Sequence, residues 1–336
     1  MPSPIIIATR GSALALAQAH SILAQCRAEF PQLAFELKII KTTGDKLQAV
    51  PLANPNQEIP KGLFTKELEV ALLKGEADLA VHSLKDLPTD LPNGLKLAAV
   101  GRRADVRDVL VYRDADFTLP TPHSTRRSAN PPGALRGLKP GAGLRDFPAG
   151  ATIATSSTRR QAQLLAVRPD LKLVPIRGNV GTRLNKLAEK ADLDGLVLAA
   201  AGLARLQIRI QPNGQLQGDG TPKGLLATCL STDEMLPCVG QAALGIETRI
   251  EDERIDAVCE RLNDSQTHEC VTAERAFLRA MGGGCLSPVA AYAEIVGDQV
   301  WLRAVSFRHE TARRGEAKGG LAEAAALGEQ LAGALK

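Results

Sequence analysis

The chain has 336 residues, 44% hydrophobic and 23% charged, which favours two or three globular domains over a single core. Its 41 basic and 37 acidic residues give a net charge of +4, too weak by itself to indicate nucleic-acid binding. The six cysteines form no Cys-x-x-Cys pair, so neither a disulfide framework nor a metal site is expected. Because no signal peptide or membrane-spanning apolar run is visible, we expect a cytoplasmic protein without membrane contact.

Strand and helix patterns alternate through most of the chain. Short apolar strands are expected at 5–8, 35–39, 79–82, 95–100, 109–112, 151–154, 171–174 and 196–199. Helices are expected at 13–28, 64–73, 180–190 and 201–206, and another helix at Ser157. This alternation is typical of parallel α/β sheets.

The remaining segments are expected to form a small α+β domain and three loops. The end of the chain predicts a helix at 272–280, a hairpin of 289–295 and 300–306, and a closing helix at 321–335. Residues 42–62, 120–150 and 213–224 are rich in turn-forming residues and are expected to be loops.

Two predicted strand-to-helix junctions resemble each other. One runs through Thr9-Arg10-Gly11-Ser12, and the other through Thr155-Ser156-Ser157 with Arg159 and Arg160 in the first helical turn. Hydroxyls and free N–H groups at a helix start bind anions, and such sites lie at the carboxyl ends of parallel strands. The sequence therefore predicts two similar α/β lobes with a ligand cleft between them.

Basic residues recur beside these predicted strand ends and helix starts. They are Arg10, Lys85, Arg159, Arg160, Arg177, Arg183 and Arg205. Because arginine binds carboxylates in a fork geometry, the group indicates a small polyanionic ligand, although any single member could be an ordinary surface arginine. The segment 177–183 resembles a phosphate loop but lacks the Gly-Lys-Ser/Thr ending that a nucleotide site needs.

Asp86 and Cys285 are the candidates for chemistry. Asp86 follows a buried strand, where a carboxylate can stabilise a cation and move a proton; the alternatives are a helix cap or an ion pair with Lys85. Cys285 follows three glycines and is a candidate covalent attachment point, the alternative being a small buried apolar residue, which we favour for the other five cysteines. His82 is expected to be a packed residue.

Eight motifs, in order along nearly the whole chain, resemble those of the hydroxymethylbilane synthase (porphobilinogen deaminase) family. They are Ala8-Thr9-Arg10-Gly11-Ser12, residues 61–69 (KGLFTKELE), residues 81–88 (VHSLKDLP), residues 155–161 (TSSTRRQ), residues 177–183 (RGNVGTR), residues 200–203 (AAGL), residues 271–275 (VTAER) and Gly283-Gly284-Cys285. Chance agreement at so many places is not expected.

The resemblance implies two lobes like those of type II periplasmic binding proteins plus a small α+β domain. The implied domains are 1–101 with 229–248, 102–228, and 249–336. It also implies a dipyrromethane cofactor joined by a thioether to Cys285, to which four porphobilinogen molecules are added with loss of ammonia. Water then releases hydroxymethylbilane. A monomer is expected, whose partners are porphobilinogen and the growing pyrrole chain.

The same resemblance assigns roles to individual residues. Asp86 is the catalytic carboxylate, which stabilises the azafulvenium cation left by ammonia loss and accepts the pyrrole proton. Cofactor-binding positions are Ser12, Lys85, Ser157, Arg159, Arg160, Gly178 and Arg183, besides Cys285. Substrate-binding positions are Arg10, Lys61, Arg177 and Arg205, with Lys61 in a lid.

Three departures from the family pattern are visible. The lid segment 53–60 lacks a basic residue, and Ala154 and Ala242 stand where glycine is common. Residues 124–144 resemble an insertion, which we expect to be a mobile loop whose deletion leaves activity within a few-fold.

Two other functions are weighed against this enzyme. A binding protein for a small anion would suit the two lobes, but it would need no third domain with an exposed cysteine. Nucleic-acid binding could use Arg126, Arg127, Arg136, Lys139 and Arg145. Only one aromatic, Phe147, is near them for stacking, so a solvated loop is expected instead.

Overall fold

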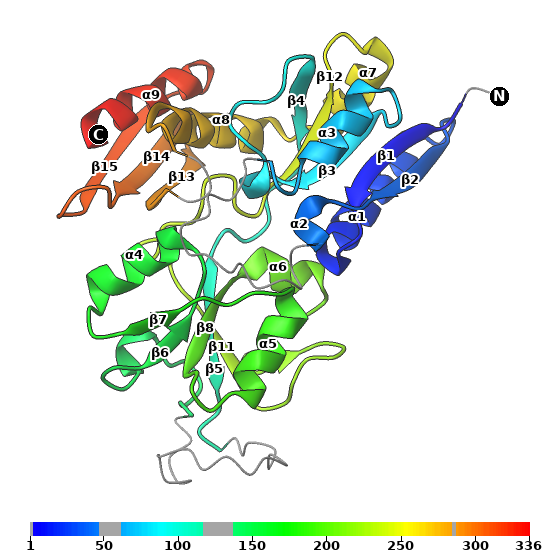
Figure 1. Ribbon diagram of the computed structural model, residues 1–336. Coiled ribbons are helices and arrows are strands. Elements are labelled where there is room, and N and C mark those ends of the chain that lie inside the picture. The colour runs from blue at the N-terminus through cyan, green and yellow to red at the C-terminus, as the bar shows by residue number, and fades with distance from the viewer. Residues whose placement is uncertain (1–2, 47–61, 117–136, 284–286) are drawn as a thin grey trace. The chain divides into compact units, whose positions relative to one another are not determined.

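The computed structural model describes residues 3–46, 62–116, 137–283 and 287–336 (Figure 1). The chain divides into two compact units, residues 1–106 with 236–336 and residues 107–235. Lys61, Cys285 and the lid segment 53–60 lie outside the described residues, as do Arg126, Arg127 and Arg136.

The first unit contains a five-stranded sheet in the order β2-β1-β3-β12-β4. Its strands are β1 (Ile5–Arg10), β2 (Phe35–Ile40), β3 (Leu79–Ser83), β4 (Leu95–Val100) and β12 (Leu244–Arg249). Strand β1 is parallel to β2 and β3, whereas β12 is antiparallel to both of its neighbours. The helices are α1 (Ala13–Glu29), α2 (Thr43–Lys46), α3 (Lys66–Leu73) and α7 (Glu253–Leu262).

Both faces of this sheet are covered, which explains the uninterrupted apolar run of β1. Ile5 and Ile7 pack in a cluster with residues of α1 and α7, such as Ile22 and Val258. Ala8 points to the other face, where its cluster includes residues of α3. Alternate side chains of a strand face opposite sides, so a strand buried on both sides must be apolar throughout.

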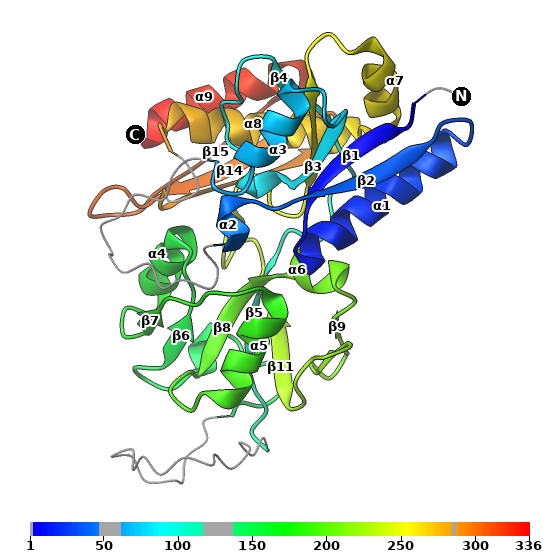
Figure 2. The ribbon, with the colours of Figure 1, turned by 45° about the vertical axis from the view of Figure 1, so that its right-hand side comes forward.

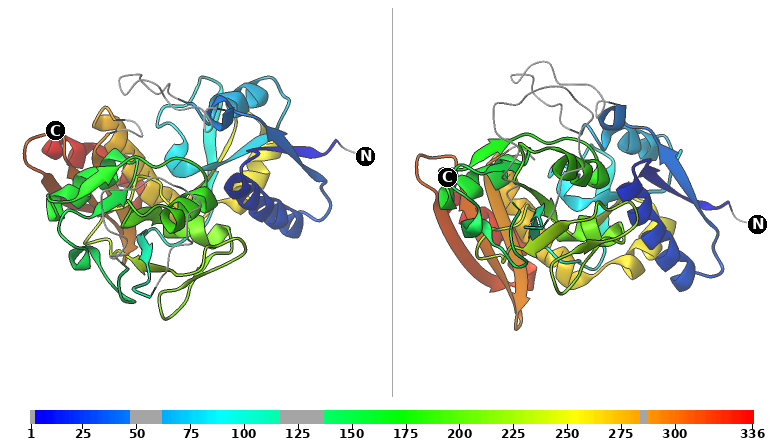
Figure 3. Two further views of the ribbon diagram at one scale, coloured as in Figure 1. Left: turned by 60° about the horizontal axis from the view of Figure 1, so that its bottom comes forward. Right: turned by 90° about the horizontal axis from the view of Figure 1, so that it is seen from below.

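The same unit contains the small α+β domain expected at the end of the chain. Its antiparallel sheet consists of β13 (Val289–Val296), β14 (Gln299–Ser306) and β15 (Arg313–Gly320), and β15 was not predicted. Helices α8 (Ser265–Ala280) and α9 (Ala324–Leu335) pack against this sheet, drawn in orange in Figure 3. The helices approach closely at Gly328, where a Cβ would lie 2.2 Å from the carbonyl oxygen of Ala273.

The second unit is built on a sheet in the order β11-β5-β8-β6-β7. Its strands are β5 (Asp108–Arg113), β6 (Thr152–Ala154), β7 (Lys172–Val174), β8 (Gly195–Ala199) and β11 (Leu225–Cys229). Helices α4 (Thr158–Val167), α5 (Val180–Glu189) and α6 (Ala200–Arg205) follow β6, β7 and β8 (Figure 2), and a short hairpin joins β9 (Arg209–Ile210) to β10 (Leu216–Gln217).

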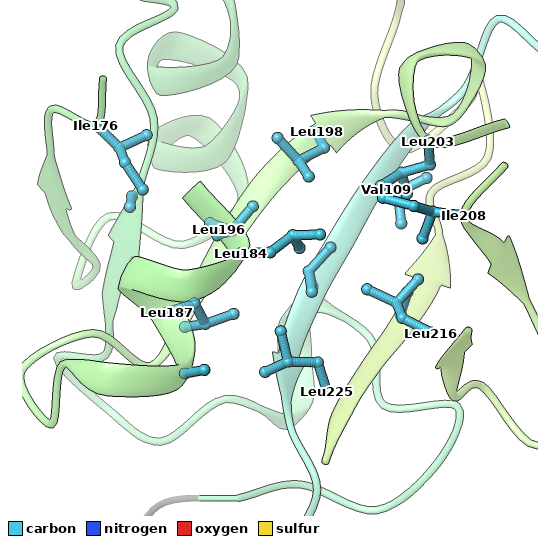
Figure 4. Packing of buried hydrophobic residues seen from close by; sticks show 14 of the residues in the cluster. Val109, Ile176, Leu184, Leu187, Leu196, Leu198, Leu203, Ile208, Leu216 and Leu225 are labelled. Atoms are coloured by element: carbon cyan, nitrogen blue, oxygen red, sulfur yellow. The ribbon is translucent and has the colours of Figure 1, made fainter. Parts of the chain in front are cut away.

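Helix α5 covers one face of this second sheet. Its Leu184 and Leu187 pack with Leu196 and Leu198 of β8 and Val109 of β5 (Figure 4). Leu164 of α4 belongs to the cluster on the opposite face. Because both faces are buried, the starts of the helices are held at one edge of the sheet, the carboxyl ends of β6, β7 and β8.

The two five-stranded sheets repeat one topology. Each contains a β-α-β-α-β run whose three strands are parallel, with the first strand of the run lying between the second and the third. A further strand pairs with the third in the antiparallel direction. That strand is β12 in the first unit and β5 in the second. This is the topology expected for lobes of type II periplasmic binding proteins, and the predicted fold class is confirmed. The predicted boundaries of the three domains stay a prediction.

The expectation that residues 124–144 form a mobile loop is wrong for the last part of this segment, from Leu138 to Leu144. The backbone N–H of Leu138 donates to Arg113 O at 2.8 Å, and Ala115 N–H donates to Leu138 O at 3.1 Å. Ala142 and Leu144, each 8% exposed, pack in the cluster that contains Tyr112. A deletion of 124–144 would therefore remove part of the core of the second unit.

Candidate functional site

Residues at the carboxyl ends of β1 and β3 line one pocket in the first unit. The lining is Arg10, Ser12, Leu14, Ala15, Gln18, Phe64, Thr65, Val81, His82, Ser83 and Asp86. The structure thus brings together three of the predicted site residues, Arg10, Ser12 and Asp86. They meet because β1 and β3 are parallel neighbours whose ends lie at the same edge of the sheet.

The backbone around Asp86 is held by the groups behind it. Residues Leu84–Asp86 form a single 3-10 turn, in which Leu84 N–H donates to Ala243 O at 3.1 Å. Gly240 lies against this turn with φ of 68°, and a Cβ there would stand 3.1 Å from the Leu84 side chain. Leu84 and Leu87 are buried, whereas Asp86 is exposed. The two buried leucines therefore hold the turn in place, while the Asp86 carboxylate stays accessible to a ligand.

Arg10 is oriented by partners that the sequence did not reveal. Its guanidinium forms an ion pair with Asp45 of α2 and lies 4.3 Å from the centre of the Phe64 ring. Burial alone would raise the pKa of Asp45, but hydrogen bonds from Arg10 and Thr42 hold that pKa below its ordinary value. Asp45 falls within residues 42–62, which were expected to be a loop, so no periodic pattern marked it.

Ser12 and His82 have structural partners in the same pocket. The Ser12 hydroxyl accepts from Ala15 N–H at 3.3 Å and caps α1, as its place at the helix start predicts. His82 is 5% exposed, and its Nε2 lies 2.9 Å from Glu247 Oε2 on the neighbouring strand. The prediction that His82 is a packed residue is confirmed.

In the second unit, the predicted residues lie where α4 and α5 begin. Ser157 caps α4, its hydroxyl accepting from Arg160 N–H at 3.4 Å, and Asn179 caps α5 by accepting from Thr182 N–H at 2.8 Å. Gly178 has φ of 108°, and a Cβ there would stand 2.7 Å from the Thr182 side chain. Only glycine fits this position. The backbone just before α5 is therefore not covered by a side chain at residue 178.

Arg159 and Arg160 are buried and share one carboxylate. Arg159 Nη1 lies 2.7 Å from Asp108 Oδ2, and Arg160 Nη2 lies 2.8 Å from Asp108 Oδ1. Asp108 is fully buried, which would raise its pKa, yet the two guanidinium groups hold that pKa well below its ordinary value. Because β5 is antiparallel to β8, its first residue reaches the edge where α4 starts.

The other predicted arginines of this unit differ in exposure. Arg177 is exposed, whereas Arg183 is half-buried and donates from Nε to Gly178 O at 2.8 Å. Arg205, the last residue of α6, is half-buried, and burial lowers the pKa of its guanidinium to about 10. A partly desolvated cation of this kind gains most from a carboxylate ligand.

The described cysteines differ in their surroundings. Cys26, Cys259 and Cys270 are buried, and burial raises the pKa of Cys26 to about 11 and those of Cys259 and Cys270 to about 12. These three remain thiols at neutral pH and are poor nucleophiles. Cys229 and Cys238 are only half-buried, so the expectation that all five are buried is wrong for these two.

Asp108→Asn is expected to destabilise the second unit by about 3–5 kcal/mol at neutral pH, because it removes the negative charge that two buried guanidinium groups share. The folded-state pKa of Asp108 is depressed, so its contribution is complete above the unfolded value of about 4 and is lost as pH falls below it. Urea unfolding should therefore show a constant difference in the free energy of unfolding between variant and wild type from neutral pH to about pH 5. This difference should become smaller below about pH 4.

The matched control for this variant is Asp170→Asn. Asp170 also pairs with an arginine, Arg168 at 2.7 Å, but its side chain is 40% exposed. We expect only a small change in stability there, because water screens the pair. An equally small change for Asp108→Asn would contradict the structural role given to Asp108.

The fold defines a two-lobed α/β protein, in which each lobe has helix starts and basic groups at one edge of its sheet and the first lobe has the exposed Asp86 in a pocket with Arg10. Two family models match the chain: "Porphobilinogen deaminase, dipyromethane cofactor binding domain" over residues 5–257, and "Porphobilinogen deaminase, C-terminal domain" over residues 268–336. The chain therefore belongs to the porphobilinogen deaminase family and contains its dipyrromethane cofactor binding domain. It is a transferase of porphyrin biosynthesis whose substrate is porphobilinogen.

Two relatives named porphobilinogen deaminase are similar to nearly the whole chain. The porphobilinogen deaminase of Syntrophus aciditrophicus is 44% identical over 97% of this chain and 93% of that protein, and that of Geotalea uraniireducens is 41% identical over 97% and 89%. Among solved structures, the methionine binding protein MetQ is 13% identical, with a TM-score of 0.39 over 80% of this chain and 91% of that chain. In the described part of the chain, no helix has the length and apolar character needed to cross a membrane.

Proposed function

We propose that the chain joins four porphobilinogen molecules head to tail, with loss of ammonia, on a dipyrromethane held by Cys285, and that water then releases hydroxymethylbilane. The observation that carries the proposal is the exposed Asp86 in a pocket with Arg10 and Ser12. A non-enzymatic anion-binding protein would need the basic groups but would have no use for this carboxylate.

The proposal gives each of the three domains a different role. Domain 1 (1–101 with 229–248) carries the catalytic carboxylate, domain 2 (102–228) binds carboxylates of cofactor and substrate, and domain 3 (249–336) carries the attachment cysteine. The separate core of β13, β14, α8 and α9 supports treating the last segment as a domain. A thioether linkage, a monomeric state and a cytoplasmic location complete the proposal.

The chemistry of the donor set fits a dipyrromethane. Each of its pyrroles carries an acetate and a propionate. The helix starts capped by Ser12, Ser157 and Asn179 offer N–H groups for these carboxylates, and the two serines also offer hydroxyls. The residues proposed to hold it are Ser12, Lys85, Ser157, Arg159, Arg160, Gly178 and Arg183. Those proposed for substrate are Arg10, Lys61, Arg177 and Arg205. When bound, the cofactor supplies the pyrrole carbon to which the first substrate is joined.

Asp86 performs two tasks in this proposal. Loss of ammonia leaves a cation on the substrate, which the carboxylate stabilises at short range. The pyrrole carbon that attacks this cation must lose its own proton once the new carbon–carbon bond has formed, and Asp86 would accept that proton. The buried Leu84 and Leu87 on either side keep the carboxylate in place for both steps. Arg10, held by Asp45, keeps a positive charge beside the site for the substrate carboxylates.

Intact mass measurement of the purified protein tests the proposal. A loaded enzyme should exceed the mass of the printed sequence by two deaminated porphobilinogen units, and incubation with porphobilinogen should release a linear tetrapyrrole. A protein of unmodified mass that binds porphobilinogen without consuming it would instead identify an anion-binding protein.

A further inference from the structure

Arg275, in the middle of α8, binds the backbone that leaves the Asp86 turn. Its guanidinium is buried, with the residue 7% exposed. Nη1 donates to Leu87 O at 3.1 Å, and Nη2 donates to Pro88 O at 2.6 Å and to Thr89 O at 3.4 Å. One side chain of α8 thus donates to three consecutive carbonyls directly after Asp86, of which Thr89 O also accepts from Arg279 Nη2 at 2.9 Å.

The sequence explains why these carbonyls need a side-chain partner. Pro88 has no N–H group and disfavours helical backbone at Leu87, so the 3-10 turn cannot continue into a helix. Leu87 is extended, with φ of −83° and ψ of 125°, and residues 87–94 belong to no helix or strand. Buried or half-buried carbonyls outside regular structure need another donor, and Arg275 donates charge-assisted bonds to all three.

The neighbouring residue of α8 holds the other side of the same turn. Glu274 is fully buried and accepts from Gly240 N–H at 2.7 Å and from Arg103 at 2.6 and 3.0 Å. A Cβ on Gly240 would stand 3.2 Å from Leu84 C and 3.3 Å from Lys85 N, so this glycine packs against the Leu84–Lys85 peptide, one residue before Asp86. Helix α8 therefore contacts the turn from both sides, through Gly240 before Asp86 and through Arg275 after it.

We infer that Arg275 is a positioning residue that fixes the Asp86 carboxylate for turnover by clamping residues 87–89. The inference rests on the catalytic role proposed for Asp86. Arg275 bonds to the backbone that follows Asp86, so its loss should lower kcat more than it weakens substrate binding. Misplacing a reacting group by about 1 Å commonly costs on the order of a hundredfold in rate.

A pocket beside Arg275 makes chemical rescue feasible. It has a volume of about 460 Å³ and is lined by Thr89, Asp90, His268, Thr272, Arg275 and Arg279, among others. In Arg275→Ala, the vacated space would open into this pocket. Free guanidinium could then enter and donate to the same carbonyls.

The test compares Arg275→Ala with a matched arginine in the same unit. Arg249 also donates to two backbone carbonyls, Leu72 O at 2.9 Å and Ala77 O at 2.6 Å, but at the opposite end of β12 from Asp86. For Arg275→Ala we expect kcat to fall about 30- to 100-fold with KM within about threefold, whereas Arg249→Ala should lose thermal stability and keep its kcat.

Guanidinium chloride separates positioning from a general loss of structure. At tens of millimolar, far below the molar concentrations that unfold proteins, it should raise kcat of Arg275→Ala several-fold and saturably. Equal sodium chloride should not do so, and neither wild type nor Arg249→Ala should respond. If Arg275→Ala does not fold, Arg275→Lys is compared with Arg249→Lys. A lysine ammonium lacks the planar fork of the guanidinium, so we expect kcat to fall in Arg275→Lys but not in Arg249→Lys.

The inference is overturned if kcat of Arg275→Ala stays within about threefold of wild type, or falls without any response to guanidinium. In the fallback pair, an unchanged kcat in Arg275→Lys overturns it. Failure of the proposed function looks different, because Asp86→Asn would then turn over normally. An inactive Asp86→Asn beside a fully active Arg275→Ala refutes the clamp alone.

Discussion

Asp86→Asn is expected to leave the enzyme folded and loaded with cofactor but to lower kcat by about a hundredfold or more. Asparagine has nearly the same shape, so the turn anchored by Leu84 and Leu87 should persist. The amide has no negative charge to stabilise the substrate cation and cannot accept the pyrrole proton. Both proposed tasks of the carboxylate are lost in one substitution.

Porphobilinogen consumption, measured at saturating substrate, decides this prediction. Asp90→Asn is the matched control, because Asp90 is exposed, lies four residues further along and pairs with Arg279 at 3.0 Å. It should retain a kcat close to wild type. Near-normal turnover in Asp86→Asn would remove Asp86 from the mechanism, whatever the stability of the variant.

The sequence predicted the elements whose signals are local. The strand at 95–100 matches β4, and the helix expected at 13–28 matches α1 to within one residue, because each has an apolar pattern of its own. Strand β12 was not predicted as an element. It pairs between β3 and β4, although the whole second unit separates it from them in the chain, and only the assembled sheet supplies its partners.

The candidate site likewise contains residues that the sequence predicted and supporting partners that it did not. Ser12, Ser157 and Asp86 follow strands directly, so the rule that ligands bind at carboxyl ends of parallel strands was enough to select them. Their supporting partners come from distant parts of the chain, for example Asp45 for Arg10 and Arg275 for the Asp86 turn. A contact between residues so far apart in the sequence leaves no local pattern, so only the three-dimensional structure shows it.

Cys285→Ser is expected to abolish turnover and to yield protein without the extra mass of two deaminated pyrrole units. Sequential addition requires an anchor that survives several cycles, and a thioether resists water better than the ester a serine could form. Cys285 lies outside the described residues, but its neighbours are informative. Gly282 has φ of 65°, and a Cβ on Gly283 would stand 2.5 Å from Ser287 Oγ. Gly282 therefore has a left-handed backbone, which favours glycine, and a side chain at position 283 would have to displace the Ser287 hydroxyl.

The other cysteines provide the controls for this assignment. Raised pKa values make Cys26, Cys259 and Cys270 unreactive, so the competing attachment points are the half-buried Cys229 and Cys238. Cys229→Ser and Cys238→Ser should each keep the added mass and remain active. Peptide mapping of wild type should place that mass on the peptide containing Cys285. Finding it on Cys229 or Cys238, or full activity in Cys285→Ser, would move the attachment point elsewhere and leave the C-terminal domain without its proposed task.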